Sequence, residues 1–230
     1  MRALLESAGI FLKNEQLEQL ETYREMLLDW NTRMDLTSVR EGDVAVRHFL
    51  DSLLPLGTGE LVPASGKLID VGTGAGFPGL PLAVALPALQ VTLLDAQEKR
   101  CAFLRAVTER LALKNVRVIH GRAEEAARDP ALREGFDAAT ARAVAGMRVL
   151  CEYLLPFVKV GGSALCWKGP AAVQELTEAE NAIRLLGGGE TKIWPMNCGE
   201  EQHVVVQVKK NCATAEKYPR KNGIPAKRPL

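Results

Sequence analysis

The stretch KLIDVGTGAGFPGLPLA, residues 67–83, passes from an apolar run through closely spaced glycines into a segment that contains prolines. The run KLIDV is typical of a buried strand, and prolines are tolerated where the next helix starts because those amides have no helical partner. Gly72, Gly74 and Gly76 let the backbone approach a ligand at the carboxyl edge of the strand, where open α/β sheets bind ligands. The sequence therefore predicts a cofactor-binding loop that uses Gly72 and Gly74.

A carboxylate at the end of the next apolar run supports this interpretation. Asp95 ends the run QVTLLD, 23 residues after Gly72. An acid at this spacing commonly accepts hydrogen bonds from the ribose hydroxyls of a bound nucleoside. The loop and the acid together predict a cofactor that contains a nucleoside.

Two residues beside the glycines distinguish between two such cofactors. The dinucleotide fingerprint G-x-G-x-x-G requires glycine at position 77, where this chain has Phe77. Asp70 would repel a pyrophosphate but suits the positively charged amino and sulfonium groups of S-adenosylmethionine. We therefore expect S-adenosylmethionine, with Asp70 near its charged end. A nicotinamide-dependent oxidoreductase is the disfavoured alternative.

The apolar pattern changes along the chain. Residues 1–60 look helical, with apolar positions at spacings of three and four between residues 14 and 31. After Gly66, strands alternate with helices, which implies a parallel sheet covered on both faces. The predicted strands are residues 67–71, 90–95, 116–120, 136–140 and 161–167, and the predicted helices are residues 80–86, 98–112, 145–158 and 171–186.

The last strands are predicted to run differently. The segments TKIWPM and QHVVVQVKK, residues 191–196 and 202–210, are joined by a short connection and read as an antiparallel hairpin. Rossmann-like methyltransferases commonly close their sheet with such a reversed strand. We expect an α/β, Rossmann-like fold divided into an N-terminal helical extension (residues 1–60), a methyltransferase domain (residues 61–210) and a basic C-terminal tail (residues 211–230).

Composition excludes several classes of protein. A chain of 230 residues with 47% hydrophobic residues can bury one sizeable core, and a net charge of +1 confines any nucleic-acid contact to local patches. The five cysteines include no CxxC pair, which argues against a disulfide framework and a structural zinc, so we expect no metal. No apolar run approaches the ~18 residues of a membrane span, and no signal peptide is evident. We expect a cytoplasmic protein.

Several motifs point to one family. The segments IDVGTGAGFPGLPLA, LLDAQEKRCAFL, GRAEE, ATARAVA and WKG occur in this order, after WNTRMDLTSVRE and VRHFLDSL. Together they closely resemble the bacterial small-subunit ribosomal RNA methyltransferase G family, also called glucose-inhibited division protein B. The resemblance runs from about residue 30 to the C-terminus. It implies a class I methyltransferase fold and methyl transfer from S-adenosylmethionine to nitrogen-7 of a guanine in 16S rRNA. The implied partner is that RNA or the small ribosomal subunit, with no obligate protein partner.

The resemblance also implies roles for individual residues. Gly72 and Phe77 would line the cofactor pocket, and Ala123 and Glu124 of GRAEE would lie beside the adenine. Arg142 of ARAVA would reach into the active site. The chain departs from the family in its Asp-Leu-Thr segment, residues 35–37, where Asn-Leu-Thr is usual. This departure weakens the case for an RNA contact at position 35.

The implied chemistry is consistent with what the sequence lacks. Guanine nitrogen-7 carries a lone pair and no proton, so its methylation requires alignment and water exclusion but no general base. The strand at residues 136–140 is followed by ARAVA, not by the Asp/Asn-Pro-Pro-aromatic turn of exocyclic-amine methyltransferases. Arg142 lies two residues past this strand, at the ligand-facing edge of the sheet, and is expected to position cofactor or guanine. We interpret His48 and Asp51 as a helix-packing pair and not as catalytic residues.

Basic residues near the predicted sheet edge and in the tail are candidates for RNA binding. Lys168 follows the strand ALCW, where it could contact a phosphate. The tail contains Glu216 and five cations, which are Lys217, Arg220, Lys221, Lys227 and Arg228. We expect this tail to grip rRNA phosphates. The alternatives are a tail that straps the protein structurally and, for the whole chain, a ribosome-assembly factor that retains the fold without catalysis.

Overall fold

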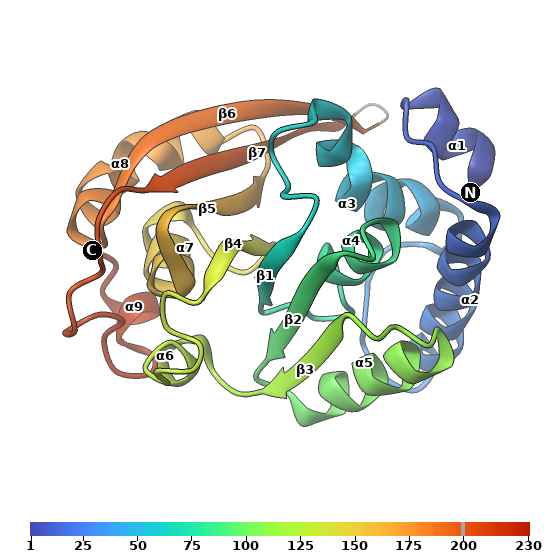
Figure 1. The fold of residues 1–230 in the computed structure, drawn as a ribbon, viewed down its shortest axis with the longest axis horizontal. Coiled ribbons are helices and arrows are strands. Elements are labelled where there is room, and N and C mark those ends of the chain that lie inside the picture. Colours follow the sequence, from blue (N-terminus) through green and yellow to red (C-terminus); the bar gives the residue numbers. More distant parts are fainter. Residues whose placement is uncertain (199–200) are drawn as a thin grey trace.

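A computed structural model describes residues 1–198 and 201–230. In these residues, one seven-stranded sheet forms the centre of the molecule, in the order β3-β2-β1-β4-β5-β7-β6 (Figure 1). Strands β1 to β5 are parallel, whereas β7 is antiparallel to both of its neighbours. The predicted mostly parallel sheet with an antiparallel end is confirmed. The strands are β1 (Gly66–Val71), β2 (Leu89–Asp95), β3 (Val116–His120), β4 (Phe136–Arg142), β5 (Val158–Lys168), β6 (Gly188–Cys198) and β7 (Glu201–Lys210).

Helices cover both faces of the sheet because the strands bury apolar side chains on both sides. Leu68 of β1 joins a core with α2 (Asn14–Asn31), α4 (Gly79–Ala85) and α5 (Glu98–Arg110). Its neighbour Ile69 joins a second core with α7 (Met147–Leu154) and α8 (Ala172–Leu185). Successive residues of a strand point to opposite faces, so the two cores lie on opposite sides of the sheet.

The N-terminal extension is less helical than its apolar pattern predicts. After α1 (Arg2–Ser7) and α2, residues 32–40 form a loop. The Asn31 side chain stops the helix there, because its Oδ1 accepts the Leu36 and Thr37 amides at 2.9 and 3.0 Å. A 3₁₀ turn (Glu41–Asp43), a π-helical turn (Ala45–Leu50), α3 (Asp51–Leu53) and a second 3₁₀ turn (Leu54–Thr58) follow.

The later elements also differ in extent from the prediction. The helix expected over residues 145–158 ends at Leu154, and a 3₁₀ turn (Leu155–Phe157) leads directly into β5. β6 and β7 extend into the predicted hairpin connection, of which residues 199 and 200 lie outside the described residues. Two short helices were not predicted, α6 (Ala123–Ala126) and α9 (Ile224–Lys227). No helix in the described ranges has the length and apolarity that crossing a membrane requires.

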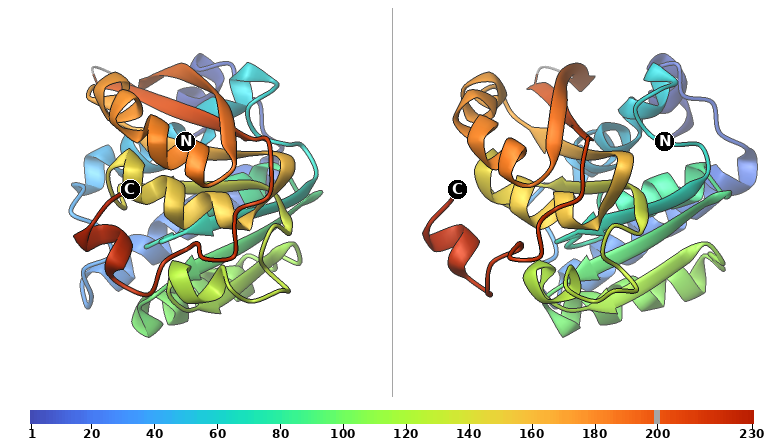
Figure 2. Two further views of the ribbon diagram at one scale, coloured as in Figure 1. Left: turned by 90° about the vertical axis from the view of Figure 1, so that its left-hand side faces the viewer. Right: turned by 60° about the vertical axis from the view of Figure 1, so that its left-hand side comes forward.

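The C-terminal tail runs back along the domain after β7, and α9 packs against α7 (Figure 2). The Arg133 guanidinium donates hydrogen bonds to the carbonyls of Thr214 and Tyr218, at 2.7 and 2.9 Å. Both tail residues are buried. The tail is therefore attached to the domain by backbone contacts along its length.

Candidate functional site

The glycine loop after β1 has the backbone conformation that its sequence predicts. Gly72, Gly74 and Gly76 have φ angles of 66°, 61° and 104°, in the left-handed region that favours glycine. At Gly76 a Cβ atom would also lie 2.6 Å from the Leu80 side chain and 2.7 Å from the Tyr23 hydroxyl. Glycine is therefore required here both by conformation and by space.

Asp95 holds the glycine loop from the neighbouring strand. Its carboxylate is 3% exposed at the end of β2, where Oδ2 accepts the Gly74 amide at 2.9 Å and Oδ1 accepts the Gln97 amide at 2.8 Å. Each oxygen keeps lone-pair capacity for a further donor. A direct hydrogen bond, which was not predicted, thus connects the glycine loop to this acid.

A cavity of about 450 Å³ lies at the carboxyl ends of β1 and β2, and we call it the glycine-loop pocket. Four predicted cofactor-binding residues line it: Gly72, Asp95, Ala123 and Glu124. Tyr153 of α7 and Ala226 of α9 also line it, and neither was predicted. The structure therefore brings residues from three successive strand ends into one concave site.

Asp70 precedes Val71 and Gly72, which line this pocket, but its own side chain is fully buried and is not part of the lining. Its Oδ2 accepts hydrogen bonds from the Thr73 hydroxyl at 2.6 Å and from the Gly79 amide at 2.8 Å. Burial is the main cause that raises the pKa of this carboxyl to about 6. Its Oδ1 has no hydrogen-bond partner within the described residues, so it remains an acceptor for a cationic or hydrated group. An orphaned acceptor here fits the ammonium end of S-adenosylmethionine.

Phe77 lies outside the lining of the glycine-loop pocket. Its ring is 4% exposed and stacks between Tyr23 and His48, with centroid distances of 5.2 and 4.5 Å. The Arg142 guanidinium carbon is 5.1 Å from the ring centroid. In this structure Phe77 therefore forms an aromatic floor beneath Arg142.

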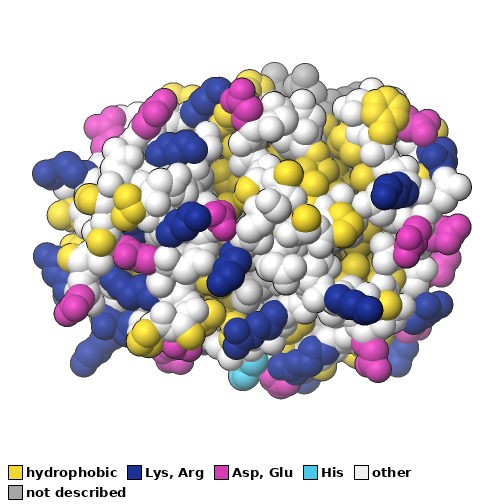
Figure 3. Space-filling model, viewed as in Figure 1, with side chains coloured by type: hydrophobic (Ala, Val, Ile, Leu, Met, Phe, Trp, Pro, Cys, Tyr) yellow, Lys and Arg dark blue, Asp and Glu magenta, His cyan; other side chains and the backbone are white. Residues whose placement is uncertain are grey.

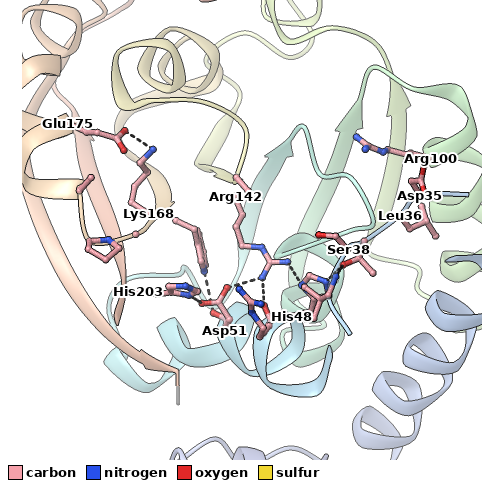
Figure 4. A pocket seen from close by; sticks show the side chains of 18 residues that line it. Asp35, Leu36, Ser38, His48, Asp51, Arg100, Arg142, Lys168, Glu175 and His203 are labelled. Atoms are coloured by element: carbon pink, nitrogen blue, oxygen red, sulfur yellow. Dashed lines mark hydrogen bonds and ion pairs between the residues drawn. The ribbon is translucent and has the colours of Figure 1, made fainter. Parts of the chain in front are cut away.

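A larger cavity of about 800 Å³ surrounds Arg142, and we call it the Arg142 pocket (Figure 4). Arg142 Nη1 lies 2.8 Å from Asp51 Oδ2 and donates to the Arg47 carbonyl at 3.0 Å, while Nη2 lies 2.9 Å from His48 Nδ1. The other Asp51 oxygen, Oδ1, lies 2.9 Å from Nδ1 of His203. Asp51 is only 1% exposed, so this carboxylate is a buried counter-charge for Arg142.

This network corrects one expectation and adds residues that were not predicted. His48 and Asp51 do not form the expected pair but are connected through Arg142. Burial and the Arg142 charge lower the pKa of His48 to about 4, so the ring is neutral at neutral pH. Asp51 and His203 are 152 residues apart, and no local motif joins them. They can be identified only from the structure, in which the two chain segments that carry them meet at Arg142.

One loop forms a wall between the two pockets. Ala143 lines the Arg142 pocket, whereas Val144, Ala145 and Gly146 line the glycine-loop pocket. Lys168, at the end of β5, braces this loop, because its Nζ donates to the Ala145 carbonyl at 3.0 Å and pairs with Glu175 at 2.6 Å. Lys168 lines the Arg142 pocket, as expected from its position, but its ammonium group already has protein partners.

The tail contacts the glycine-loop pocket directly. Arg220 pairs with the fully buried carboxylate of Glu152 at 2.6 Å, and the Gly223 amide donates to Glu124 Oε1 at 3.0 Å. These contacts are those of a structural strap. The remaining predicted RNA-binding residues of the tail are exposed: Lys217, Lys221, Lys227 and Arg228. Figure 3 shows Lys and Arg side chains gathered on the lower left of the molecule, where Figure 1 places α6 and α9.

No group of three or more His, Cys, Asp or Glu side chains that could hold a metal ion occurs in the described part of the chain. Cys101, Cys151, Cys166 and Cys212 are free thiols. Burial raises the pKa of Cys151 and of Cys166, so neither has the thiolate character of a nucleophile.

Comparison with known proteins identifies relatives of the whole chain. The family model described as rRNA small subunit methyltransferase G matches residues 16–205. The ribosomal RNA small subunit methyltransferase G of Alkaliphilus metalliredigens is 46% identical over 96% of this chain and 94% of its own. The protein of the same name from Leuconostoc citreum is 47% identical over 98% and 96%.

A solved structure supports the fold class. The TYW2 protein of M. jannaschii, solved in complex with AdoMet, superposes with a TM-score of 0.51 over 67% of this chain and 72% of its own, at 16% identity. At this identity the likeness concerns the fold alone. Together with the strand order, it assigns the class I S-adenosylmethionine methyltransferase fold.

Proposed function

We propose that this chain, which belongs to the rRNA small subunit methyltransferase G family, transfers a methyl group from S-adenosylmethionine to nitrogen-7 of a guanine in 16S rRNA. The observation that carries the proposal is the pair of pockets on either side of the 143–146 loop. One has the loop and acid suited to a nucleoside, and the other is large enough for a base. Such a substrate places the protein in the cytoplasm.

The glycine-loop pocket would hold S-adenosylmethionine, which supplies an electrophilic methyl group when bound. Asp95 would accept hydrogen bonds from the ribose hydroxyls, with Gly72 and Gly74 giving close backbone approach. Ala123 and Glu124 would lie beside the adenine. The unpaired Oδ1 of Asp70 would receive the positively charged amino group, directly or through a water molecule.

The Arg142 pocket would hold the guanine. Arg142 would act as a positioning residue, fixed by Asp51 and His48 above the Phe77 ring. Nitrogen-7 has no proton to lose, so its methylation leaves the base positively charged. The Asp51 carboxylate would offset the charge that develops beside Arg142. His48 is an unsuitable base, because its Nδ1 already accepts from Arg142 and its pKa is about 4.

The RNA backbone would contact the basic residues around these pockets. We propose Lys168, Arg220, Lys221, Lys227 and Arg228 as phosphate contacts, of which the last three are exposed and can be tested without disturbing an ion pair in the described structure. Replacing Lys221, Lys227 and Arg228 together by Ala should weaken RNA binding. It should also lessen the slope of log K against log salt by roughly 0.7–0.9 per lost contact. An unchanged slope would remove the tail from the RNA surface.

A methyl-transfer assay tests the proposed reaction. Small subunits from a strain that lacks the native modification are incubated with labelled S-adenosylmethionine, and the labelled nucleotide is mapped and digested to nucleosides. The expected product is 7-methylguanosine at one position of 16S rRNA. A different methylated nucleoside would overturn the site of transfer. Tight binding to the subunit without label incorporation would support the assembly-factor alternative instead.

A further inference from the structure

The hydroxyl group of Thr37 has an unusual set of partners on the wall of the Arg142 pocket. Its Oγ1 accepts a hydrogen bond from the Val39 amide at 3.1 Å and lies 2.7 Å from Nε2 of His48. A threonine hydroxyl has two lone pairs and one proton. The direction of the contact with His48 therefore decides where that proton can point.

Arg142 determines this direction. A guanidinium group can only donate, and its Nη2 lies 2.9 Å from Nδ1 of His48, so Nδ1 must be the unprotonated, accepting nitrogen. The neutral imidazole then carries its single proton on Nε2 and donates it to Thr37 Oγ1. A doubly protonated ring would place a proton between Nδ1 and Arg142. Arg142 therefore donates to both Asp51 and His48, and His48 donates in turn to Thr37.

Both lone pairs of the Thr37 hydroxyl are consequently used, by His48 and by the Val39 amide. Its own proton has no acceptor in the described part of the chain, and the residue lines the pocket. An unconstrained threonine can rotate its hydroxyl and serve as either donor or acceptor. Thr37 is restricted to the donor role, and its proton is available to a ligand.

We infer that Thr37 is a specificity residue that donates a hydrogen bond to the O6 atom of a guanine in the Arg142 pocket and thereby rejects adenine. This inference rests on the proposed function. Guanine presents two adjacent acceptors, N7 and O6, on the edge where methylation is proposed, whereas adenine presents an amino donor in place of O6. Two donors facing each other would leave both unpaired in a partly buried site.

The loop that carries Thr37 is held independently of its hydroxyl. Asn31 clamps the Thr37 backbone, with Oδ1 accepting its amide and Nδ2 donating to its carbonyl, each at 3.0 Å. Replacement of Thr37 by Val therefore removes the hydroxyl and its contacts but keeps the size of the side chain and the main anchor of the loop. Thr37→Ser restores the hydroxyl and is the matched control.

The test uses small subunits reconstituted from transcribed 16S rRNA, with either guanine or adenine at the nucleotide that the wild-type protein is first shown to modify. We expect Thr37→Val to lower kcat/KM on guanine by roughly tenfold, the value of one lost hydrogen bond. We also expect it to reduce the preference for guanine over adenine by at least roughly tenfold. Thr37→Ser should retain both properties, and Thr37→Ala should repeat the loss.

Two further measurements separate specificity from folding. Thr37→Val should still melt cooperatively, somewhat below Thr37→Ser because it lacks the hydrogen bonds to His48 and to the Val39 amide. The dissociation constant for S-adenosylmethionine should be the same for both variants. If Thr37→Val and Thr37→Ala keep the wild-type kcat/KM and base preference, the inference about Thr37 is overturned. The proposed function would still stand in that case, provided that the product is 7-methylguanosine. A wild-type product other than 7-methylguanosine would overturn both.

Discussion

The glycine-loop pocket and the Arg142 pocket share a wall at residues 143–146 but are constructed differently. The first is made largely by backbone turns and by acids that hold backbone amides, as Asp95 holds Gly74. The second is made by side chains that hold one another, with Asp51, Arg142 and His203 drawn from distant parts of the chain. Substitutions in the glycine-loop pocket should therefore lower cofactor affinity, whereas substitutions in the Arg142 pocket should lower the rate of methyl transfer.

The largest effect is expected from Asp51 in the Arg142 pocket. Asp51→Asn leaves the Arg142 charge buried without its counter-charge, and breaking a buried ion pair costs roughly 3–5 kcal/mol. We expect kcat/KM for methyl transfer to fall by roughly a hundredfold or more. The dissociation constant for S-adenosylmethionine, measured by calorimetry, should change much less.

Asp35 provides a matched control for this prediction, because it lines the same pocket but is exposed. Asp35→Asn should leave kcat/KM close to that of the wild type. Equal losses of cofactor affinity and transfer rate in Asp51→Asn would mean that the two pockets do not act separately.

The next largest effect is expected from Arg220, which attaches the C-terminal tail to the domain as a structural strap. Arg220→Ala leaves the buried Glu152 carboxylate with the backbone amide of residue 220 but without its counter-charge. This loss should cost roughly 3 kcal/mol and lower the melting temperature by roughly 6–12 °C. Because the Gly223 amide and Ala226 reach the glycine-loop pocket, S-adenosylmethionine affinity should fall as well. Lys221→Ala, one residue away and exposed, should change neither quantity. A variant at Arg220 with wild-type melting temperature would argue against the strap.

Asp95 should produce a smaller effect, mainly on cofactor binding. Asp95→Ala removes the proposed acceptor for the ribose hydroxyls. Hydrogen bonds to a charged group contribute roughly 1.5–3 kcal/mol, so cofactor affinity should fall by about ten- to a hundredfold. The transfer rate at saturating cofactor should stay near that of the wild type. Glu98→Gln, on the exposed start of α5, is the control for charge alone. Unchanged affinity in Asp95→Ala would refute the ribose assignment.

The smallest effect is a pH dependence from Asp70. Burial raises the pKa of this carboxyl to about 6, so the cationic amino group of the cofactor meets a carboxylate above that pH and a neutral acid below it. Affinity should be constant above about pH 7 and fall by roughly tenfold by pH 5. For the ligand-free protein the sign is opposite: this group favours the folded state most at low pH, and that contribution is lost as the pH rises through about 6. Asp70→Asn should abolish the pH dependence of binding.

The same contrast explains what the sequence can and cannot predict. Gly72 and Asp95 are recognisable because a strand followed by a glycine turn and an acid at the end of the next strand constrain local backbone geometry. Asp51 and His203 are not, because a buried ion network depends on where β4, β7 and the π-helical turn meet. The prediction of helix over residues 32–40 was wrong for a related reason, because the conformation of this loop depends on one side chain, that of Asn31, whose Oδ1 accepts backbone amides. The tail was predicted from charge, but Arg220 is held by Glu152, a residue whose burial no local pattern reveals.

The position of β7 between β5 and β6 also sets an order of events during synthesis. β1, β2 and β4, which lead to Gly72, Asp95 and Arg142, are complete when the chain reaches β5. The Asp51 network still lacks His203, which is made later. β6 is made before β7 and cannot join the sheet until β7 fills the gap. A nascent chain stopped before residue 201 should therefore protect the amides of β1 and β2 from hydrogen exchange but leave those of β6 open. The Arg142 pocket is thus completed only when the last strand has been made.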